Sequence, residues 1–218
     1  MNGLTFTTAM ARAVCEGRKT QTRRLSGLAE VHAAGNPELL GVFTEFDQVN
    51  RCDIHRHHFE DTMGGDDIIA YPRYHVGKKL ALLTTWVVSF DHDDLKPTEL
   101  ACIGKAQLWH AGMGTPKPCG KSRPGRFLPN HLRPLMPQLE ITAVRCQRLQ
   151  DITEDDAEAE GVEHHSRPEG GWDTYGKHHE HCPVVAYAQL WDSINLKSGH
   201  GWETNPWCFA YSCKLLSK

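Results

Sequence analysis

A short basic segment near the N-terminus combines groups that bind phosphate with groups that exchange protons. Residues 17–24 read GRKTQTRR. Guanidinium groups form forked hydrogen bonds with phosphate oxygens, and the segment carries three of them, in Arg18, Arg23 and Arg24. Lys19 adds an ammonium group, and Thr20 and Thr22 add two hydroxyls. By themselves, these residues fit either a site for phosphate or a nucleotide, or a solvated basic turn.

An acidic run lies far along the chain from this basic segment. Residues 154–160 read EDDAEAE, and Thr153 stands three positions before Asp156, which is the spacing of a capping box with Asp in place of Glu. Acidic residues in a first turn also suit the helix dipole. We therefore expect a short helix from 154 to 160 that ends at Gly161, with Glu160 in its last turn.

Two further helices are predicted from capping residues and apolar spacing. Thr7 or Thr8 can cap a short helix that precedes the basic segment, and Gly17 occupies the place of a left-handed C-terminal cap. A longer amphipathic helix is expected after residue 183. Its buried face is predicted to carry Val184, Tyr187, Ala188, Trp191 and Ile194.

Strands and insertions fill the rest of the chain. Apolar or alternating patterns predict strands at 80–88, 139–145 and 207–215. Breaker residues and histidine-rich stretches predict loops or insertions, at 26–75, 110–137 and 163–183. Short helices interleaved with strands, without a repeated strand–helix–strand unit, favour a compact α+β barrel that forms one domain over 1–218.

Composition is that of an ordinary folded protein. Of 218 residues, 39% are hydrophobic and 23% are charged, and the formal net charge is -3, so binding of a polyanion requires local clustering of basic residues. No signal peptide or long apolar run is visible, so we expect a cytoplasmic protein that does not enter a membrane. The eight cysteines are irregularly spaced, which favours reduced thiols.

Two groups of histidine and cysteine are candidate metal ligands. One comprises Cys52, His55, His57 and His58, and the other comprises His178, His179, His181 and Cys182. A zinc site using Cys52, His55, His181 and Cys182 would complete a tetrahedron. The spacings follow no standard zinc-binding frame, so we expect solvated loops and no cofactor, with zinc as the alternative.

The ordered segments resemble one known family. Residues 17–24 match the Gly-x-Lys-x-x-Thr-x-Arg signature of the ASCH domain, which has a PUA-like β-barrel with short flanking helices. Agreement continues in four segments, at 77–86, 149–162, 190–195 and 201–207. In this order they are similar to a phage and prophage branch of ASCH-like proteins.

The resemblance implies an activity and its residues. Bacterial members of the family include amidohydrolases that remove the acetyl group from N4-acetylcytidine with a Lys, a Thr and a Glu, and the matching positions are Lys19, Thr22 and Glu160. Arg18, Arg23 and Arg24 would then bind substrate or nucleic acid. Phage relatives carry an Arg and a Glu where this chain has Leu83 and Thr84, a departure that implies a different ligand or lost activity.

Other functions fit the same residues. A noncatalytic RNA-binding or DNA-binding module would use the basic segment to hold phosphate and a single-stranded base. A phage regulatory protein is a third possibility. Trp172, Trp202 and Trp207 are expected in the core, with base stacking as the alternative.

Overall fold

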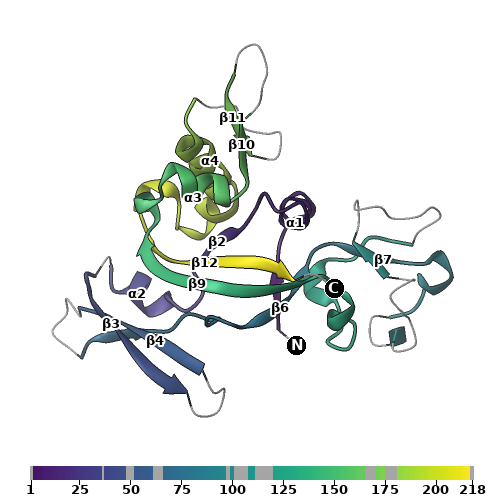
Figure 1. The fold of residues 1–218 in the computed structure, drawn as a ribbon, viewed down its shortest axis with the longest axis horizontal. Coiled ribbons are helices and arrows are strands. Elements are labelled where there is room, and N and C mark those ends of the chain that lie inside the picture. Colours follow the sequence, from purple (N-terminus) through teal and green to yellow (C-terminus); the bar gives the residue numbers. More distant parts are fainter. Residues whose placement is uncertain are drawn as a thin grey trace. The chain divides into compact units, whose positions relative to one another are not determined.

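The computed structural model describes residues 2–35, 37–47, 52–60, 66–96, 99–100, 108–110, 120–164, 170–174 and 181–216. The chain divides into two compact units. Unit 1 comprises Met1–Arg18, Lys79–Glu140 and Lys214–Lys218, and unit 2 comprises Lys19–Lys78 and Ile141–Cys213. Strands and a few short helices make up both units, which confirms the α+β class (Figure 1). The strands of the described residues fall into four separate sheets, and the closed barrel stays a prediction.

Unit 1 begins with a strand and a capped helix. Strand β1 (Gly3–Thr5) pairs in parallel with β6 (Lys79–Leu83), which pairs antiparallel with the first residues of β9 (Gln138–Arg148). Helix α1 spans Thr8–Cys15, and the Thr7 side chain accepts a hydrogen bond from the Met10 amide. Gly17 follows with a φ of 78°, in the left-handed region that glycine adopts at little cost. Both caps were predicted.

The strand predicted at 80–88 is broken in two. Strand β6 ends at Leu83, and β7 (Trp86–Val88) belongs to a separate sheet with β8 (Leu108–His110). Gly125 lies against the break, where an added Cβ would stand 2.7 Å from the Thr84 carbonyl oxygen. Within 120–137 the backbone forms an isolated β-bridge between Arg123 and Trp86 and two short 3-10 turns, η4 (Gly125–Phe127) and η5 (Arg133–Leu135), which agrees with the expected irregular structure. Buried apolar side chains from β6, β7 and the segments that follow β7 pack together in the core of unit 1. They include Leu83, Trp86, Val88, Leu100, Leu128, Leu132 and Met136.

Unit 2 contains a sheet in which β9, β12 (Trp207–Leu216) and β2 (Gln21–Arg24) are neighbours in that order. Helices α3 (Glu154–Ala159) and α4 (Pro183–Asn195) pack against each other, and α3 also contacts β2 (Figure 1). Helix α3 begins as predicted, because the Thr153 side chain accepts a hydrogen bond from the Asp156 amide. A core of eight buried residues holds these elements together: Leu149, Ile152, Ala157, Val162, Ala186, Tyr187, Trp191 and Cys208.

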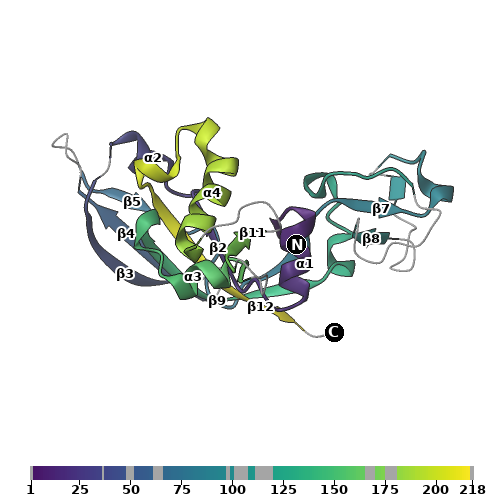
Figure 2. The ribbon, with the colours of Figure 1, turned by 90° about the horizontal axis from the view of Figure 1, so that it is seen from above.

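The prediction of a loop at 26–75 is wrong for most of the residues that the structure describes there. This region contains α2 (Ala29–Ala33) and a three-stranded antiparallel sheet of β3 (Leu39–Asp47), β4 (Cys52–Phe59) and β5 (Ile68–Ala70). Figure 2 shows these strands side by side in unit 2, where α2 contacts β5. The histidines made β4 look polar, but His57 is only 2% exposed and packs edge-on against Phe209.

Two smaller expectations also need correction. The region 163–183 is not all loop, since β10 (Val162–His164) and β11 (Trp172–Thr174) form an antiparallel hairpin, while 165–169 and 175–180 lie outside the described residues. In α4, Ile194 was placed on the buried face, but it is 55% exposed in the last turn of the helix, which ends at Asn195. None of the described helices has the length and apolar character needed to cross a bilayer.

Candidate functional site

Four charged side chains are buried together in unit 2. Lys19, Arg23 and Glu160 are each no more than 4% exposed, and Asp156 is 9% exposed. We call Lys19, Arg23, Asp156 and Glu160 the Lys19 cluster. Two formal positive charges face two formal negative charges, so the cluster is neutral as a set. Buried charges are costly unless paired in this way, so the arrangement requires the surrounding fold to hold each partner in place.

Backbone hydrogen bonds place the basic segment between a helix end and a strand. The Thr20 amide donates to the Ala159 carbonyl at 2.8 Å, and the Cys213 amide donates to the Thr20 carbonyl at 2.8 Å. Glu160 caps the C-terminus of α3, and Gly161 follows with a φ of 96°, which lets the chain turn sharply after it. Two segments far apart in sequence thus meet at Lys19 and Glu160.

Lys19 contacts Glu160 through two hydrogen bonds. Its Nζ donates to Glu160 Oε2 at 2.6 Å and to the Glu160 carbonyl oxygen at 2.7 Å. Burial lowers the pKa of Lys19 below its ordinary value, although the nearby charge of Glu160 acts in the opposite direction. The amine therefore loses its proton more readily than an exposed lysine would, which is the property needed in a base.

Arg23 links both carboxylates of the cluster. Its Nη2 lies 2.7 Å from Asp156 Oδ2, and its Nη1 lies 3.2 Å from Glu160 Oε1. Nη1 also donates to Gln21 Oε1 at 2.7 Å. The guanidinium lies over the Tyr187 ring, 5.7 Å from its centroid, and burial raises the pKa of that phenol, with Glu160 adding to the effect. Both terminal nitrogens of Arg23 are thus paired, whereas its Nε is buried without a hydrogen bond to the described residues, and the guanidinium acts as an internal counter-ion.

Asp156 accepts hydrogen bonds from three residues. Besides Arg23, the donors are Gln21 Nε2 at 3.0 Å and Arg145 Nη2 at 2.8 Å, both to Oδ1. Burial raises the pKa of Asp156, but the hydrogen bonds from Arg145 and Gln21 and the charge of Arg23 outweigh burial and lower it overall. The carboxylate therefore stays ionised and holds Arg23 toward Glu160.

Thr22 and Arg24 project to the opposite face of β2 from Gln21 and Arg23, because side chains alternate along a strand. Thr22 is 4% exposed and stands opposite Tyr211 of β12. Within the described residues, the structure gives no hydrogen bond from the Thr22 hydroxyl to Lys19 or Glu160. Arg24 is half-buried, and burial lowers its pKa while the charge of Glu160 opposes this.

A cysteine connects Lys19 with the face that carries Thr22. Cys213 lies two positions after Tyr211, so both side chains project to that face of β12. Burial raises the pKa of the Cys213 thiol to about 11, while the charge of Lys19 lowers it and that of Glu160 raises it. The charges of Lys19 and Glu160 therefore act on a side chain that lies on the same face of the sheet as Thr22.

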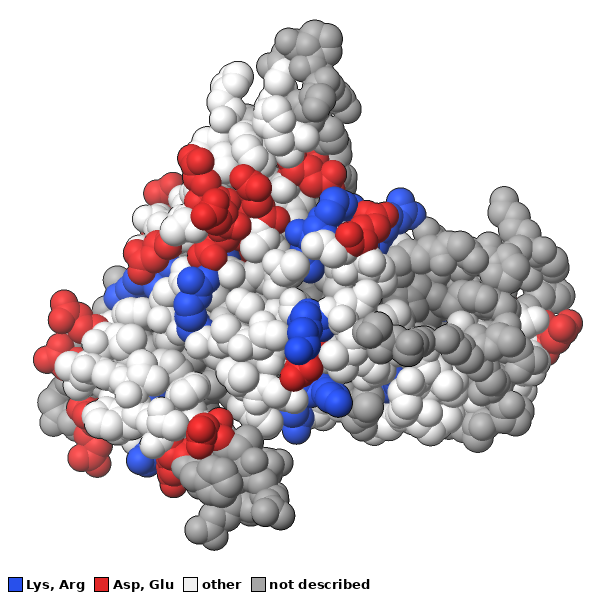
Figure 3. Space-filling model, in the orientation of Figure 1, with Lys and Arg blue, Asp and Glu red and all other residues white. Residues whose placement is uncertain are grey.

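Three of the residues singled out in the sequence, Arg18, Leu83 and Thr84, belong to unit 1. Arg18 belongs to unit 1, where it is exposed and pairs with Glu16. Leu83 and Thr84, which replace charged residues of the phage relatives, are each 3% exposed in unit 1. Acidic side chains, Glu154, Asp155 and Glu158, are exposed along α3 (Figure 3), so this part of the unit 2 surface does not attract phosphate.

The candidate zinc ligands do not form a recognisable metal centre among the described residues, where no group of three or more His, Cys, Asp or Glu is arranged to hold an ion. His55 lies on β4, His181 is exposed, and Cys182 precedes α4. His178 and His179 lie outside the described part of the chain, as does the Cys52 side chain. Zinc stays an alternative for which the described side chains give no support.

Sequence reasoning missed four members of the site and its surroundings: Gln21, Asp156, Arg145 and Tyr187. Asp156 was assigned only to a helix cap, and its side chain proves to be the carboxylate that binds Arg23. The signal available was the alternation of Gln21 and Arg23 on β2, two polar side chains that share one face. Two long polar side chains on a buried strand require polar partners.

Comparisons with known proteins give no independent assignment for this arrangement. No protein-family model, no curated protein and no solved structure matches the chain. The geometry of unit 2 and the resemblance of the sequence segments are therefore the two grounds for a functional proposal.

Proposed function

We propose that unit 2 has an ASCH-type, PUA-like site that hydrolyses an acyl amide on a modified nucleoside, of the N4-acylcytidine type. The observation that carries the proposal is the buried contact of 2.6 Å between Lys19 Nζ and Glu160 Oε2. The resemblance assigns catalytic roles to these two residues, which are 141 positions apart. The resemblance of the sequence segments gives these roles without reference to the contact, so the contact supports them independently.

The proposed reaction uses Thr22 as nucleophile and Lys19 as base. The Thr22 hydroxyl attacks the acyl carbonyl while its proton passes to the neutral Lys19 amine. The tetrahedral intermediate then breaks its bond to the cytosine N4 nitrogen, which takes a proton from Lys19 or Glu160 and leaves as cytidine. Water next hydrolyses the acyl ester of Thr22, which releases the carboxylic acid and restores the hydroxyl. No metal or redox partner is needed for these steps to balance.

The electrostatics of the cluster support these roles. A base must be able to lose its proton near neutral pH, and burial lowers the pKa of Lys19. Glu160 accepts hydrogen bonds from both Lys19 and Arg23. When Lys19 is neutral, the Arg23 guanidinium therefore still balances the negative charge of the Glu160 carboxylate. Arg24 lies on the same face of β2 as Thr22, which suits it to orient the substrate carbonyl.

The competing proposal of a noncatalytic nucleic-acid-binding module has weaker support. Phosphate recognition needs guanidinium groups that reach the ligand, whereas Arg23 has a side chain that is 0% exposed and is already paired with Asp156 and Glu160. A module of that kind would also bind oligonucleotides with a strong salt dependence.

The test is incubation with N4-acetylcytidine, with cytidine and acetate measured by chromatography. We expect turnover in the wild type and a loss of at least about 100-fold in Lys19→Ala and Glu160→Gln, the size of a general acid–base contribution. Thr22→Val should lose activity, and Thr22→Ser should keep part of it because the hydroxyl remains. Thr20→Val is the matched control, since Thr20 is exposed in the same segment.

Two results would overturn the proposal. One is the absence of cytidine release by the wild type across a range of N4-acyl groups. The other is turnover by Thr22→Val equal to that of Thr20→Val. Salt-dependent oligonucleotide binding that Arg24→Ala weakens, together with no turnover, would support the binding module in its place.

A further inference from the structure

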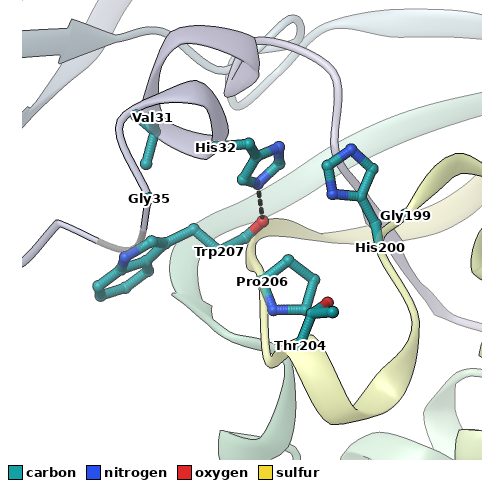
Figure 4. A pocket seen from close by; sticks show the side chains of 8 residues that line it. All are labelled: Val31, His32, Gly35, Gly199, His200, Thr204, Pro206 and Trp207. Carbon is teal, nitrogen blue, oxygen red and sulfur yellow. Dashed lines mark hydrogen bonds between the residues drawn. The ribbon is translucent and has the colours of Figure 1, made fainter.

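A hollow in unit 2 lies between α2 and the segment that leads into β12 (Figure 4). Its volume is about 220 Å³, and its walls include Val31, His32, His200, Thr204, Pro206 and Trp207. We call it the His32 pocket. None of its lining residues belongs to the Lys19 cluster.

Aromatic rings form much of the wall of this pocket. The imidazoles of His32 and His200 lie with their centroids 4.7 Å apart and their planes tilted by 44°, and Figure 4 shows them beside each other. The Trp207 indole also lines the pocket but extends away from the two imidazoles in Figure 4, and the Arg148 guanidinium lies 4.4 Å from its centroid. Flat faces of this kind favour a flat ligand, because bases stack on aromatic side chains.

Hydrogen bonds to backbone carbonyls fix these rings before any ligand enters. His32 Nε2 donates to the Trp207 carbonyl at 2.9 Å, and Trp207 Nε1 donates to the Pro37 carbonyl at 2.9 Å. A ligand that binds between rings held in this way does not bear the entropic cost of ordering them.

Of the polar groups that remain in the pocket, His32 and Thr204 offer acceptors, and the neutral His200 imidazole offers one donor and one acceptor. Because Nε2 of His32 donates to a carbonyl, Nδ1 of the neutral ring carries a lone pair. The Thr204 hydroxyl donates to the Gly201 carbonyl at 2.7 Å, which leaves its oxygen able to accept. Within the described residues, neither imidazole nitrogen of His200 has a hydrogen bond. Burial lowers the pKa of His32, and the nearby His200 and Arg148 lower it further, so this acceptor persists at neutral pH.

The volume limits the size of the ligand. Pockets for drug-sized molecules have volumes of about 300–1,000 Å³, and the His32 pocket lies below that range. One ring system therefore fits, with any larger attachment outside. A ring that matches the pocket is flat, of single-base size, and able to donate a hydrogen bond to His32 Nδ1 or to the Thr204 oxygen.

We propose that the His32 pocket binds a heteroaromatic ring that carries an exocyclic amino group, the chemistry of adenine and cytosine. The ring lies against the aromatic walls, and its amino group donates to His32 Nδ1 or the Thr204 oxygen. The proposal is independent of the amidohydrolase site, since each can fail while the other holds. If both hold, unit 2 contacts two bases and its substrate is an oligonucleotide.

The experiment is a titration of isotope-labelled wild-type protein with adenosine and cytidine, followed by NMR at the His32 and His200 imidazoles and the Trp207 indole N–H. Inosine and uridine are the matched ligands, because each replaces the amino group with a carbonyl. We expect saturable shifts with the amino-bearing pair and at least tenfold weaker binding of the carbonyl pair. Equal binding of both pairs, or no shifts at these three residues, would overturn the proposal.

Variants locate the site and separate it from the proposed activity. His200→Ala and Thr204→Val should each weaken adenosine binding at least threefold, with the thermal midpoint of unfolding unchanged. His75→Ala is the control, because His75 is outside the pocket and bonds only to the neighbouring Val76 carbonyl. Lys19→Ala should bind adenosine like the wild type. Unchanged binding in both pocket variants would refute the assignment, and the comparison of ligands on the wild type decides the question if a variant does not fold.

Discussion

Replacement of Arg23 by methionine tests whether the buried charges of unit 2 depend on one another. Methionine keeps much of the length of the side chain but removes the guanidinium, whose side chain is 0% exposed. Asp156 and Glu160 would lose bonds of 2.7 and 3.2 Å and remain in a dry environment. Removing one member of a buried ion pair costs about 3–5 kcal/mol. That is a large part of the 5–15 kcal/mol by which a domain is typically stable, taken as an order of magnitude.

The matched control is Arg145→Met, because Arg145 binds the same carboxylate from the outside. Its Nη2 lies 2.8 Å from Asp156 Oδ1, but its side chain is 50% exposed. Water replaces a lost exposed partner, so we expect this variant to lose about 0–1 kcal/mol. Each variant removes a bond to Asp156, and Arg23→Met also removes the buried bonds to Glu160 and Gln21.

Urea denaturation followed by tryptophan fluorescence measures both losses. With a slope of about 2 kcal/mol per molar urea, Arg23→Met should lower the midpoint by about 2 M and Arg145→Met by less than about 0.5 M. Adding Asp156→Asn should cost less in the Arg23→Met background than in the wild type, since the two residues interact directly. Losses that agree within about 1 kcal/mol for the two arginine variants would refute the reasoning.

Three further outcomes follow from caps and titrating groups. Thr153→Ala should cost about 1 kcal/mol by removing the cap of α3, measured in the same urea assay; no loss would show that the cap is dispensable. Burial lowers the pKa of His57 from 6.5 to about 4, so wild-type stability should fall as pH drops through this range, by at most about 3 kcal/mol, and His57→Phe should flatten the profile. Because the proposed base is neutral Lys19, kcat/KM should rise with pH up to its lowered pKa, and a flat profile would exclude it.

Local signals predicted the elements that position the site. Thr7 and Thr153 cap their helices through side-chain hydrogen bonds at the expected positions, because an N-cap depends on residues only three positions apart. The strict alternation over 207–215 gave the strand that holds Tyr211 opposite Thr22. Features with short sequence range were therefore accessible from the sequence.

Features that depend on burial or on contacts between distant residues could not be predicted from the sequence. The sheet at 39–70 was taken for a loop because histidine counts as polar in a pattern, whereas His57 is neutral and packs on Phe209. The break at Thr84 comes from the close approach of Gly125, which no local pattern encodes. Likewise, the partner of Arg23 is Asp156, 133 residues away, and only the folded sheet and helix bring them together.

The separation between Lys19 and Glu160 has a consequence for synthesis of the protein. Ribosomes add about 5–20 residues per second, so the 141 positions between these residues correspond to roughly 10 to 30 s. During that time the basic segment has left the ribosome, but its carboxylate partners do not yet exist. Strand β2 also lacks β12, which is made last. The nascent chain therefore presents an unpaired cationic segment, which an anionic surface or a chaperone can bind before unit 2 closes around it.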